Sequence, residues 1–140
     1  MATVCTDTYK IENGILTWVA PKQKELDLSN KGITEIRCAF PSSLRTLYLD
    51  SNSIKEIKPN TFNSGLEWLT IEDNILECLQ PGAVPDSVFF LSVKCNKLTQ
   101  FDDGSIPNSV EELYIYGNNL KVETVRKQFP NCGVYARQND

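Results

Sequence analysis

Aliphatic side chains recur along most of the chain at a fixed interval of 22 residues, with one interval of 21 near the start. Each repeat unit has six such positions, which form six columns when the units are aligned. The first two columns are Leu26, Leu47, Leu69, Leu91 and Leu113, and then Leu28, Leu49, Ile71, Val93 and Ile115. The other four are Ile33, Ile54, Leu76, Leu98 and Leu120; Ile36, Ile57, Leu79 and Phe101; Phe40, Phe62, Val84 and Ile106; and Leu44, Leu66, Val88 and Val110. A constant spacing over so many positions predicts a repeat architecture.

The spacing within one unit predicts a short strand followed by turns. Alternation with period two, which is typical of a strand, occurs only at Leu47 and Leu49 and at the equivalent pairs. The other apolar positions are separated by Asn, Pro, Asp and Ser, which favour turns. A chain that turns back after every unit lays its strands side by side and in parallel, about 4.8 Å apart. No unit can close a core alone, so its aliphatic side chains are buried only when neighbouring units stack. Burial stabilises the fold by roughly 1.5 to 3 kcal/mol per aliphatic side chain.

Four consecutive segments follow the pattern LxxLxLxxNxL, in which x is any residue. They are LRTLYLDSNSI from Leu44, LEWLTIEDNIL from Leu66, VFFLSVKCNKL from Val88 and VEELYIYGNNL from Val110. In this pattern the chain resembles a leucine-rich repeat protein over about residues 26–120. The resemblance implies an α/β repeat solenoid, a curved stack with a parallel sheet on its concave face. The segments VPDSV and IPNSV are also similar to FNIP-type repeats, although Phe-Asn-Ile-Pro itself is not clearly present.

An asparagine follows each of four predicted strands, at Asn52, Asn74, Asn96 and Asn118. The backbone bends where a strand ends and leaves N–H and C=O groups that need partners, and an Asn amide both donates and accepts. We therefore interpret this column as a structural ladder and not as a binding or catalytic site. The first unit has Lys31 at this position, so we expect the ladder to begin one winding late.

The sequence before the first repeat predicts a hairpin cap. In the segment YKIENGILTW, Asn13 and Gly14 lie between two apolar-rich stretches. Both residue types tolerate a positive φ, which the tight turn of a two-residue hairpin requires. We expect this hairpin to shield the first winding from water.

The sequence after the last repeat predicts a helix and a final strand. Val122, Val125 and Phe129 share one helical face, and Pro130 ends the helix. The apolar segment CGVYA that follows can add one more strand to the sheet. This ending resembles the C-terminal caps of intracellular leucine-rich repeat proteins.

The composition is typical of a single soluble domain. The chain has 140 residues, 41% of them hydrophobic, and no apolar run reaches the roughly 20 residues of a membrane span. We expect one leucine-rich repeat domain over residues 1–140, with caps at 1–25 and 121–140 and five repeats at 26–120. Because both ends look finished, we expect the chain to be a whole protein.

The N-terminus and the cysteines favour an intracellular, cytoplasmic location. The segment MATVCTDTYK lacks the basic start and apolar stretch of a secretory signal. The five cysteines have neither the paired spacing of a zinc site nor the clusters that cap secreted repeat proteins. Secretion by a signal-independent route stays open. So does an alternative function, an extracellular recognition receptor, which predicts disulfides.

The residues that most often perform catalysis are missing from the sequence. The chain has no histidine, which removes the commonest general base, and it has no glycine-rich phosphate loop. The acid pairs Asp102–Asp103 and Glu111–Glu112 are typical of solvated turns and strand starts. Cys95 is interpreted as a small residue at a strand exit and not as a reactive thiol. We therefore expect no enzyme activity, no cofactor and no metal.

Residues between the buried aliphatics of each strand must point to the other face of the sheet, which is the concave side of the stack. The large apolar side chains of Trp68 and Phe90 are neighbours there, and clustered apolar surface is costly in water unless a partner covers it. The alternative is that the two rings only stack on each other across the sheet. We favour binding, because Trp and Tyr are enriched among the residues that dominate interface energies. The three columns of this face are Glu25, Thr46, Trp68, Phe90 and Glu112; Asp27, Tyr48, Thr70, Ser92 and Tyr114; and Ser29, Asp50, Glu72, Lys94 and Tyr116.

The charges of this face indicate the kind of partner. Five carboxylates share the face with a single lysine, Lys94, so nucleic acid phosphates would be repelled. A protein partner with Lys or Arg and apolar anchors fits better.

We therefore expect a monomeric, non-enzymatic protein-protein interaction module. An alternative is a host-directed or regulatory effector, an adaptor that recruits a ubiquitin ligase or a signalling enzyme, because bacterial and viral leucine-rich repeat proteins with Pro-x-Ser-Leu-like segments resemble this sequence. The predicted partner-binding residues are Tyr48, Asp50, Trp68, Thr70, Glu72, Phe90, Ser92, Lys94, Glu112, Tyr114 and Tyr116.

Overall fold

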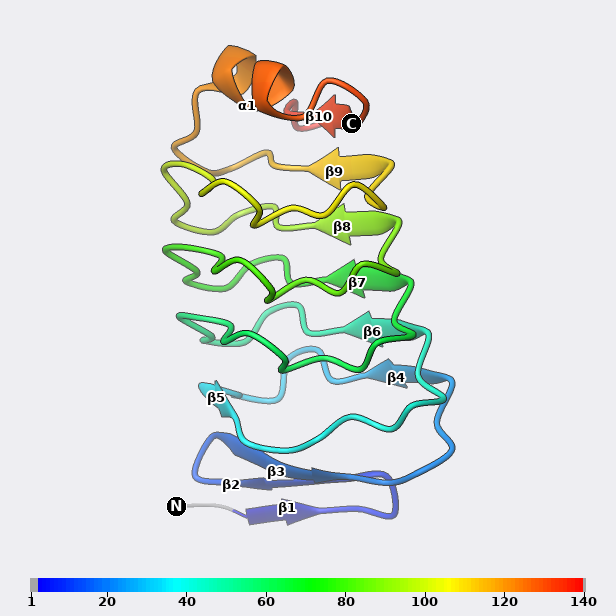
Figure 1. Cartoon of the computed structure of the whole chain (residues 1–140). Helices are drawn as coiled ribbons and strands as arrows, with labels where there is room; N and C mark the ends of the chain where they lie inside the picture. Colours follow the sequence, from blue (N-terminus) through cyan, green and yellow to red (C-terminus); the bar gives the residue numbers. More distant parts are fainter. Residues whose placement is uncertain (1–2, 140) are drawn as a thin grey trace.

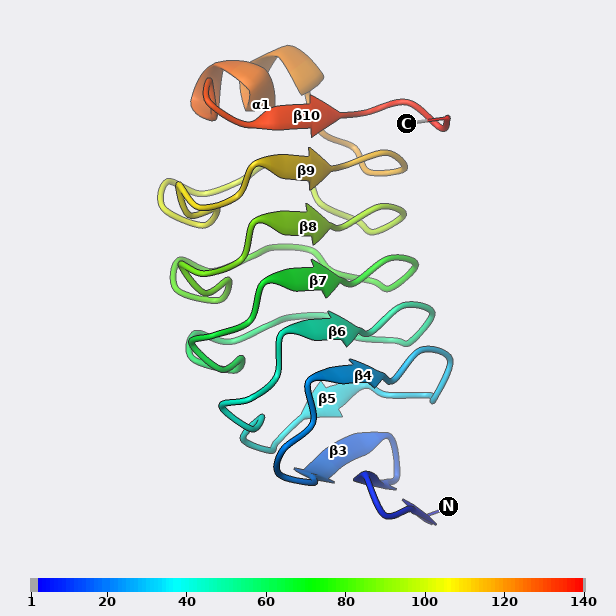
Figure 2. The ribbon, with the colours of Figure 1, turned by 90° about the vertical axis from the view of Figure 1, so that its right-hand side faces the viewer.

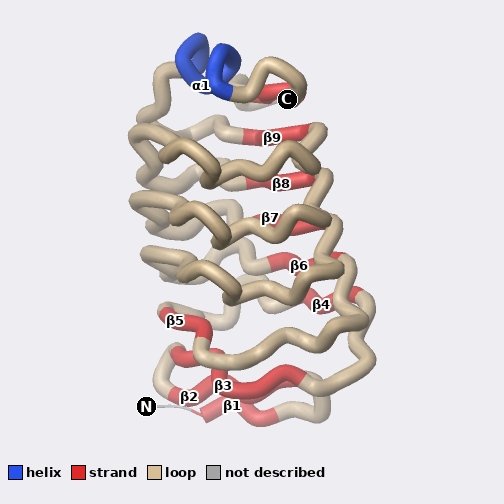
Figure 3. The backbone as a smooth tube through the Cα atoms, viewed as in Figure 1, coloured by secondary structure: helices blue, strands red, loops and turns tan. Residues whose placement is uncertain are grey.

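The predicted strands form a parallel sheet along one side of the molecule. The computed structural model describes residues 3–139 as a β-solenoid (Figure 1). Figure 2 shows one strand of this sheet per winding, and Figure 3 shows that most of the remaining winding is loop. The sheet has six strands in the order β10-β9-β8-β7-β6-β4, and all neighbours are parallel. They are β4 (Glu25–Asp27), β6 (Thr46–Tyr48), β7 (Trp68–Thr70), β8 (Phe90–Ser92), β9 (Glu112–Tyr114) and β10 (Gly133–Tyr135).

The aliphatic columns lie inside the solenoid, as the repeat predicts. The strand register places Leu47 beside Leu69 and Leu69 beside Leu91. All three side chains are fully buried. The other columns join the same apolar interior, in which Ile36 and Leu120 are only partly buried. The predicted facing of the strands, aliphatics inward and the alternate residues outward, is therefore confirmed.

The asparagine column forms the predicted ladder. Asn52 Oδ1 accepts hydrogen bonds from the backbone N–H groups of Lys31 and Ile33, each at 3.0 Å. Its Nδ2 donates to the carbonyl oxygens of Leu28 and Leu49 at 3.0 and 2.9 Å. Each Asn thus serves the winding before its own, and the same pattern recurs at the next three rungs. The first winding has no repeat before it, which explains why Lys31 is accepted there.

A second set of hydrogen bonds between windings, which is not predicted from the sequence, involves two of the serines that recur before the strands. Ser43 Oγ donates to the carbonyl oxygen of Gln23 at 2.6 Å, and Ser87 Oγ donates to that of Leu66 at 2.6 Å. The repeat between them has glycine at the serine position. There Asn63 Nδ2 takes over and donates to the carbonyl oxygen of Leu44 at 2.8 Å. Ser43 and Ser87 therefore tie successive windings together at the strand entrance, whereas the buried hydroxyl of Ser109 has no hydrogen-bond partner among the described residues.

The residue before each Asn position has a left-handed backbone. This conformation turns the chain so that the following Asn side chain can point inward. It is costly for residues with a Cβ, and Asn and Asp tolerate it best. Cys95 occupies this slot with an exposed side chain, in agreement with a structural role at the strand exit. The φ angles are 56° at Asn30, 55° at Ser51, 53° at Asp73, 56° at Cys95 and 81° at Gly117.

The predicted hairpin is present at the N-terminal end and belongs to a larger sheet. Asn13 and Gly14 have φ values of 52° and 80° and join β2 (Tyr9–Glu12) to β3 (Ile15–Val19). Two further strands, β1 (Thr3–Cys5) and β5 (Glu35–Ile36), complete a sheet in the order β1-β2-β3-β5. The sequence analysis predicts neither of them. The hairpin shields the first winding, because its Ile11, Leu16 and Val19 are buried in the common core.

The C-terminal cap has the predicted helix and strand. Helix α1 (Val122–Gln128) buries Val125, and Val122 and Phe129 pack partly buried against the core. Phe129 contacts Phe101 edge to face, with ring centroids 5.9 Å apart. The strand after Pro130 is β10, which pairs in parallel with β9.

The ladder gives a first prediction. Asn96→Ala removes the partners of the buried N–H of Leu76 and the buried C=O of Ile71. Because each unsatisfied buried group costs about 1–3 kcal/mol, we expect a loss of about 2–4 kcal/mol in the free energy of unfolding. Asn118→Ala should cost less, since its side chain is only partly buried and water can replace it. Urea unfolding of both variants measures the two changes in the free energy of unfolding. Equal losses in Asn96→Ala and Asn118→Ala would contradict the prediction.

A second prediction separates backbone strain from crowding. Gly32 and Gly117 both have positive φ, 69° and 81°. A Cβ at Gly32 would have no neighbour within 4 Å, whereas one at Gly117 would lie 3.0 Å from the Cys95 backbone. We expect Gly32→Ala to lower the free energy of unfolding by about 1–2 kcal/mol through strain alone.

Gly117→Ala should cost about 1–3 kcal/mol more, because crowding adds to the strain. Thermal or urea unfolding of the two variants gives the difference directly. If both lose the same amount, close packing between the strand exits of neighbouring windings is not a constraint.

Candidate protein-binding face

The residues of the six-stranded sheet that point away from the core are here named the sheet face, and Figure 2 shows the strands that carry them. Four rings on it stand next to one another in consecutive strands, and we name them the aromatic row. Its members are Trp68, Phe90, Tyr114 and Tyr135. The register places Phe90 beside Trp68 and Tyr135 beside Tyr114. Phe90 and Tyr114 are diagonal neighbours, because Phe90 is opposite Glu112 and Tyr114 is opposite Ser92.

The rings of the aromatic row stack on one another, as the alternative interpretation proposed. The Trp68 and Phe90 rings are parallel to within 4°, with centroids 3.6 Å apart. Phe90 and Tyr114 are tilted at 5.1 Å, and Tyr114 stacks on Tyr135 at 4.5 Å. All four residues are half-buried. Trp68 and Phe90 are therefore less exposed than the sequence analysis expected, and stacking accounts for part of their presence.

The sheet face also holds residues that the sequence analysis missed. Tyr135, in the C-terminal cap, completes the aromatic row, and no repeat period extends to it. Phe89, just before β8, contacts Trp68 edge to face at 6.1 Å and widens the row toward the strand entrances. The Trp68 indole N–H is buried and has no acceptor among the described residues, so stacking and not hydrogen bonding sets the pose of this ring.

Two predicted binding residues are not accessible. Thr70 and Ser92 are 6% and 1% exposed, so they offer almost no surface to a partner in this structure, and their contact with one stays a prediction. Their side chains are short, and the register places the two side by side between Tyr48 and Tyr114. The Thr70 hydroxyl donates to Asp50 Oδ2 at 3.0 Å, and the Ser92 hydroxyl donates to Glu72 Oε2 at 2.5 Å. Both residues therefore position the two carboxylates across the strands.

Asp50 and Glu72 are the most constrained carboxylates of the face. Asp50 Oδ1 also accepts the backbone N–H of Glu72 at 2.7 Å. Burial raises the pKa of Asp50, and the carboxylates of Glu72 and Asp27 add to this effect, while the hydrogen bonds from Glu72 and Thr70 oppose it. On the edge strand β4, Asp27 is exposed, and hydrogen bonds from Ser29 lower its pKa. Negative charge is thus concentrated on β4, β6 and β7.

The remaining predicted residues lie around the aromatic row. The Lys94 ammonium lies 5.0 Å from the centroid of the Tyr114 ring. The Tyr114 hydroxyl donates to Glu112 Oε1 at 3.4 Å, so Glu112 also borders the row. Tyr48 and Tyr116 are half-buried and lie outside the stacked rings. The face therefore has an acidic end at β4 to β7 and an aromatic end at β7 to β10.

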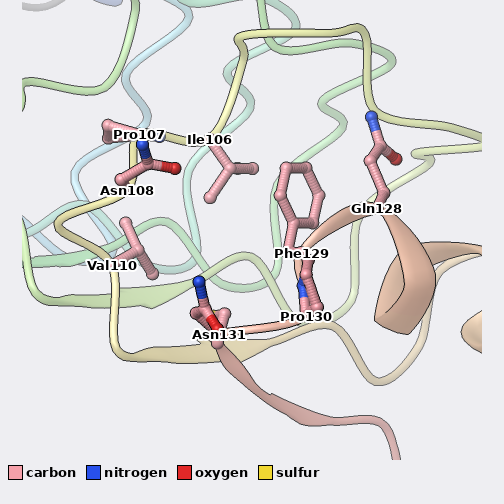
Figure 4. A pocket seen from close by; sticks show the side chains of 9 residues that line it. Ile106, Pro107, Asn108, Val110, Gln128, Phe129, Pro130 and Asn131 are labelled. Carbon is pink, nitrogen blue, oxygen red and sulfur yellow. The ribbon is translucent and has the colours of Figure 1, made fainter.

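Hollows elsewhere on the described surface differ from typical ligand sites in lining or in size. A hollow of about 320 Å³ beside β5 is large enough, but its lining is mostly polar or charged, with Arg37 and Lys55 beside Glu56. A pocket of about 90 Å³ lies between the last repeat and the C-terminal cap, where Ile106, Val110 and Phe129 face it (Figure 4). It is well below the roughly 300–1,000 Å³ of most ligand sites. Cys132 also lines this pocket, and burial raises the pKa of its thiol, which lowers its reactivity. Within residues 3–139, no group of three or more His, Cys, Asp or Glu side chains could hold a metal ion.

The cysteines are separate in the structure. All five are free, whereas the extracellular receptor alternative predicts disulfides. Burial raises the pKa of the Cys38 thiol to about 11, so it stays protonated at neutral pH. None of the helices in the described part of the chain has the length and apolar character needed to span a membrane.

A model of the leucine-rich repeat family matches residues 42–86, which cover two of the windings described above. The windings within the matched residues are leucine-rich repeats. The closer similarity to FNIP-type repeats is not confirmed by this match. No curated protein matches the chain. Leucine-rich repeats generally serve as protein-interaction modules without catalytic activity, and their stacked units provide extended binding surfaces.

The buried carboxylate gives a third prediction. Folding raises the pKa of the Asp50 carboxyl group, so this group binds protons more readily in the folded state. It therefore lowers the free energy of unfolding once the pH rises above the pKa that it has in the unfolded chain. Asp50→Asn keeps an acceptor for the Glu72 N–H and can bond to the Thr70 hydroxyl, but it carries no charge. We expect a higher urea midpoint than the wild type at pH 7 and no difference below about pH 3, where Asp50 is neutral.

Asp27→Asn is the matched control for this experiment. Hydrogen bonds lower the pKa of Asp27, so its substitution should reduce stability at pH 7 and not increase it. A lower midpoint for Asp50→Asn at pH 7 would show that hydrogen bonding outweighs burial at this carboxylate.

Proposed function

We propose that this leucine-rich repeat protein is a non-enzymatic interaction module that holds a protein partner on its sheet face. The observation that carries the proposal is the aromatic row beside an acidic end on the same sheet face. Tyr and Trp rings held rigid by stacking lose little entropy when a partner covers them. The ring edges that remain exposed offer apolar contact, and the carboxylates offer charge.

The charge of the face indicates the chemistry of the partner. Asp50 is desolvated by burial and lies close to Glu72 and Asp27, so a cation brought to this end would relieve repulsion. A protein with Lys or Arg side chains opposite β4 to β7 and apolar side chains opposite the aromatic row would match both ends. Nucleic acid would meet repulsion at the acidic end.

The dimensions of the face limit the binding mode. Six strands about 4.8 Å apart span roughly 25 Å. The area of the sheet alone is therefore smaller than the about 800 Å² per partner of a standard interface. The partner must therefore also contact the loops beside the sheet, or bind weakly. Phe89 on the strand-entrance side and the exposed Asp73 on the strand-exit side are the nearest loop residues with suitable chemistry.

Affinity capture with matched baits tests this proposal. The baits are the wild type, Trp68→Ala with Phe90→Ala, Asp27→Lys with Tyr48→Ala, and Ile75→Ala as the control. Ile75 is 37% exposed in the loop after β7, away from the sheet face. The second face variant leaves the aromatic row intact, so it keeps the test valid if the first variant unfolds. Circular dichroism verifies the fold of each bait.

A partner of the sheet face should be captured by the wild type and the control but not by either folded face variant. With the purified partner, each face variant should weaken binding about 30-fold or more, the effect of a hot spot of about 2 kcal/mol. Salt should weaken binding to the wild type more than binding to Asp27→Lys with Tyr48→Ala. Equal binding by all four baits would reject the face. If the partner is a ubiquitin ligase or a signalling enzyme, the protein acts as the adaptor that the sequence also suggests.

A further inference from the structure

The N-terminal cap sheet ends in an open strand edge. Strand β1 pairs with β2 on one side only, and its residues Thr3, Val4 and Cys5 are all exposed. Val4 is 43% exposed, a high value for a large aliphatic residue of a strand. Figure 1 shows β1 at one extremity of the stack, whereas α1 lies at the other. An unpaired edge offers free backbone donors and acceptors to another strand.

The register decides which backbone groups of β1 are free. Val4 is opposite Ile11, and the Thr6 N–H donates to the carbonyl oxygen of Tyr9, directly opposite, at 2.9 Å. In an antiparallel pair the residues face their partner strand alternately. Thr6 and Val4 therefore direct their backbone groups toward β2. Thr3 and Cys5 direct theirs away from it, into solvent.

This edge is complementary to itself. The two outward residues, Thr3 and Cys5, lie symmetrically about Val4. If two copies meet antiparallel with Val4 opposite Val4, each Thr3 is opposite the Cys5 of the other copy, and all outward N–H and C=O groups are paired. We propose that β1 is a self-association edge, at which two copies of this chain pair their β1 strands about a twofold axis.

The side chains agree with a second copy as the occupant. Val4 shares a sheet face with its opposite residue Ile11, which is buried in the core. Pairing would place the two Val4 side chains together and extend the apolar interior from one copy into the other. The other face of the seam holds the uncharged Thr3 and Cys5. The nearest charges, Lys10 and Glu12, already pair within each copy at 2.9 Å, so no net charge faces its own image.

The length of the edge sets the strength of the contact. A strand of three residues buries much less than the roughly 1,200 Å² of a stable interface, so the dimer should form only at high concentration. At low concentration the protein would be the monomer that the sequence analysis expects. The contact is also independent of the sheet face, which belongs to the other sheet.

Sedimentation velocity from about 10 µM to about 1 mM, with reductant to keep Cys5 reduced, tests the proposal at dissociation constants typical of weak complexes. The wild type should shift from monomer toward dimer. Cys5→Pro removes an N–H that points away from β2, which an edge strand tolerates, and it should abolish the shift. Val4→Lys should do the same by placing two like charges together. Ile75→Lys makes the same charge change elsewhere and should behave as the wild type.

Amide hydrogen exchange locates the contact. Between the two ends of the concentration range, the Thr3 and Cys5 N–H groups should become at least about 10-fold more protected, as pairing excludes water from them. The Val4 and Thr6 N–H groups already face β2 and should change little. A mass independent of concentration, or a dimer that persists in both Cys5→Pro and Val4→Lys, would overturn the proposal. So would new protection on the sheet face alone.

Discussion

No winding of this protein satisfies its own polar backbone or closes its own core, and the whole structure follows from that dependence. Twenty-two residues contain one short strand, and most of the remaining N–H and C=O groups have no partner inside the winding. They are satisfied across windings, by the sheet hydrogen bonds, by the asparagine ladder and by the hydrogen bonds of Ser43 and Ser87. Asn52, for example, bonds to two N–H groups of the preceding winding and to a carbonyl oxygen of that winding. The loss of an Asn from one winding therefore leaves backbone groups of the preceding winding without partners.

The same dependence dictates the surface. Because each winding is stacked on its neighbour in fixed register, equivalent side chains lie side by side at the strand spacing. Large rings at such positions contact one another, and Trp68 stacks on Phe90 as Tyr114 stacks on Tyr135. Phe90 and Tyr114 join the two pairs as diagonal, tilted neighbours. Stacking covers the faces of the rings, so only their edges are available for contact with a partner. Short side chains between them, such as Thr70 and Ser92, become buried and serve as donors to the carboxylates.

The sequence predicts those parts of the structure that repeat, and misses those that do not. One unit repeats along the solenoid at a constant period. This period is enough to place the strands, the buried columns and the asparagine ladder. Strand β1 belongs to no column. Strand β5 contains Ile36 of the fourth column, but only the folded cap brings β5 beside β3. Exposure is also unpredictable from alternation alone. Alternation shows that Ser92 points away from the core, but its burial depends on the size of the side chains in the neighbouring strands.

The two ends of the solenoid differ, and this difference restricts how copies can associate. At the N-terminal end the last strand is β1, with a short edge that is complementary to itself. At the C-terminal end, β10 belongs to the other sheet and has α1 nearby in the fold (Figure 1). A contact between β1 and β10 would join two unlike edges and could repeat without limit. A contact between two β1 strands uses the same edge twice and closes after two copies. Such a pair would present two sheet faces, so a partner with two binding segments would gain from the higher effective concentration even if each face bound weakly.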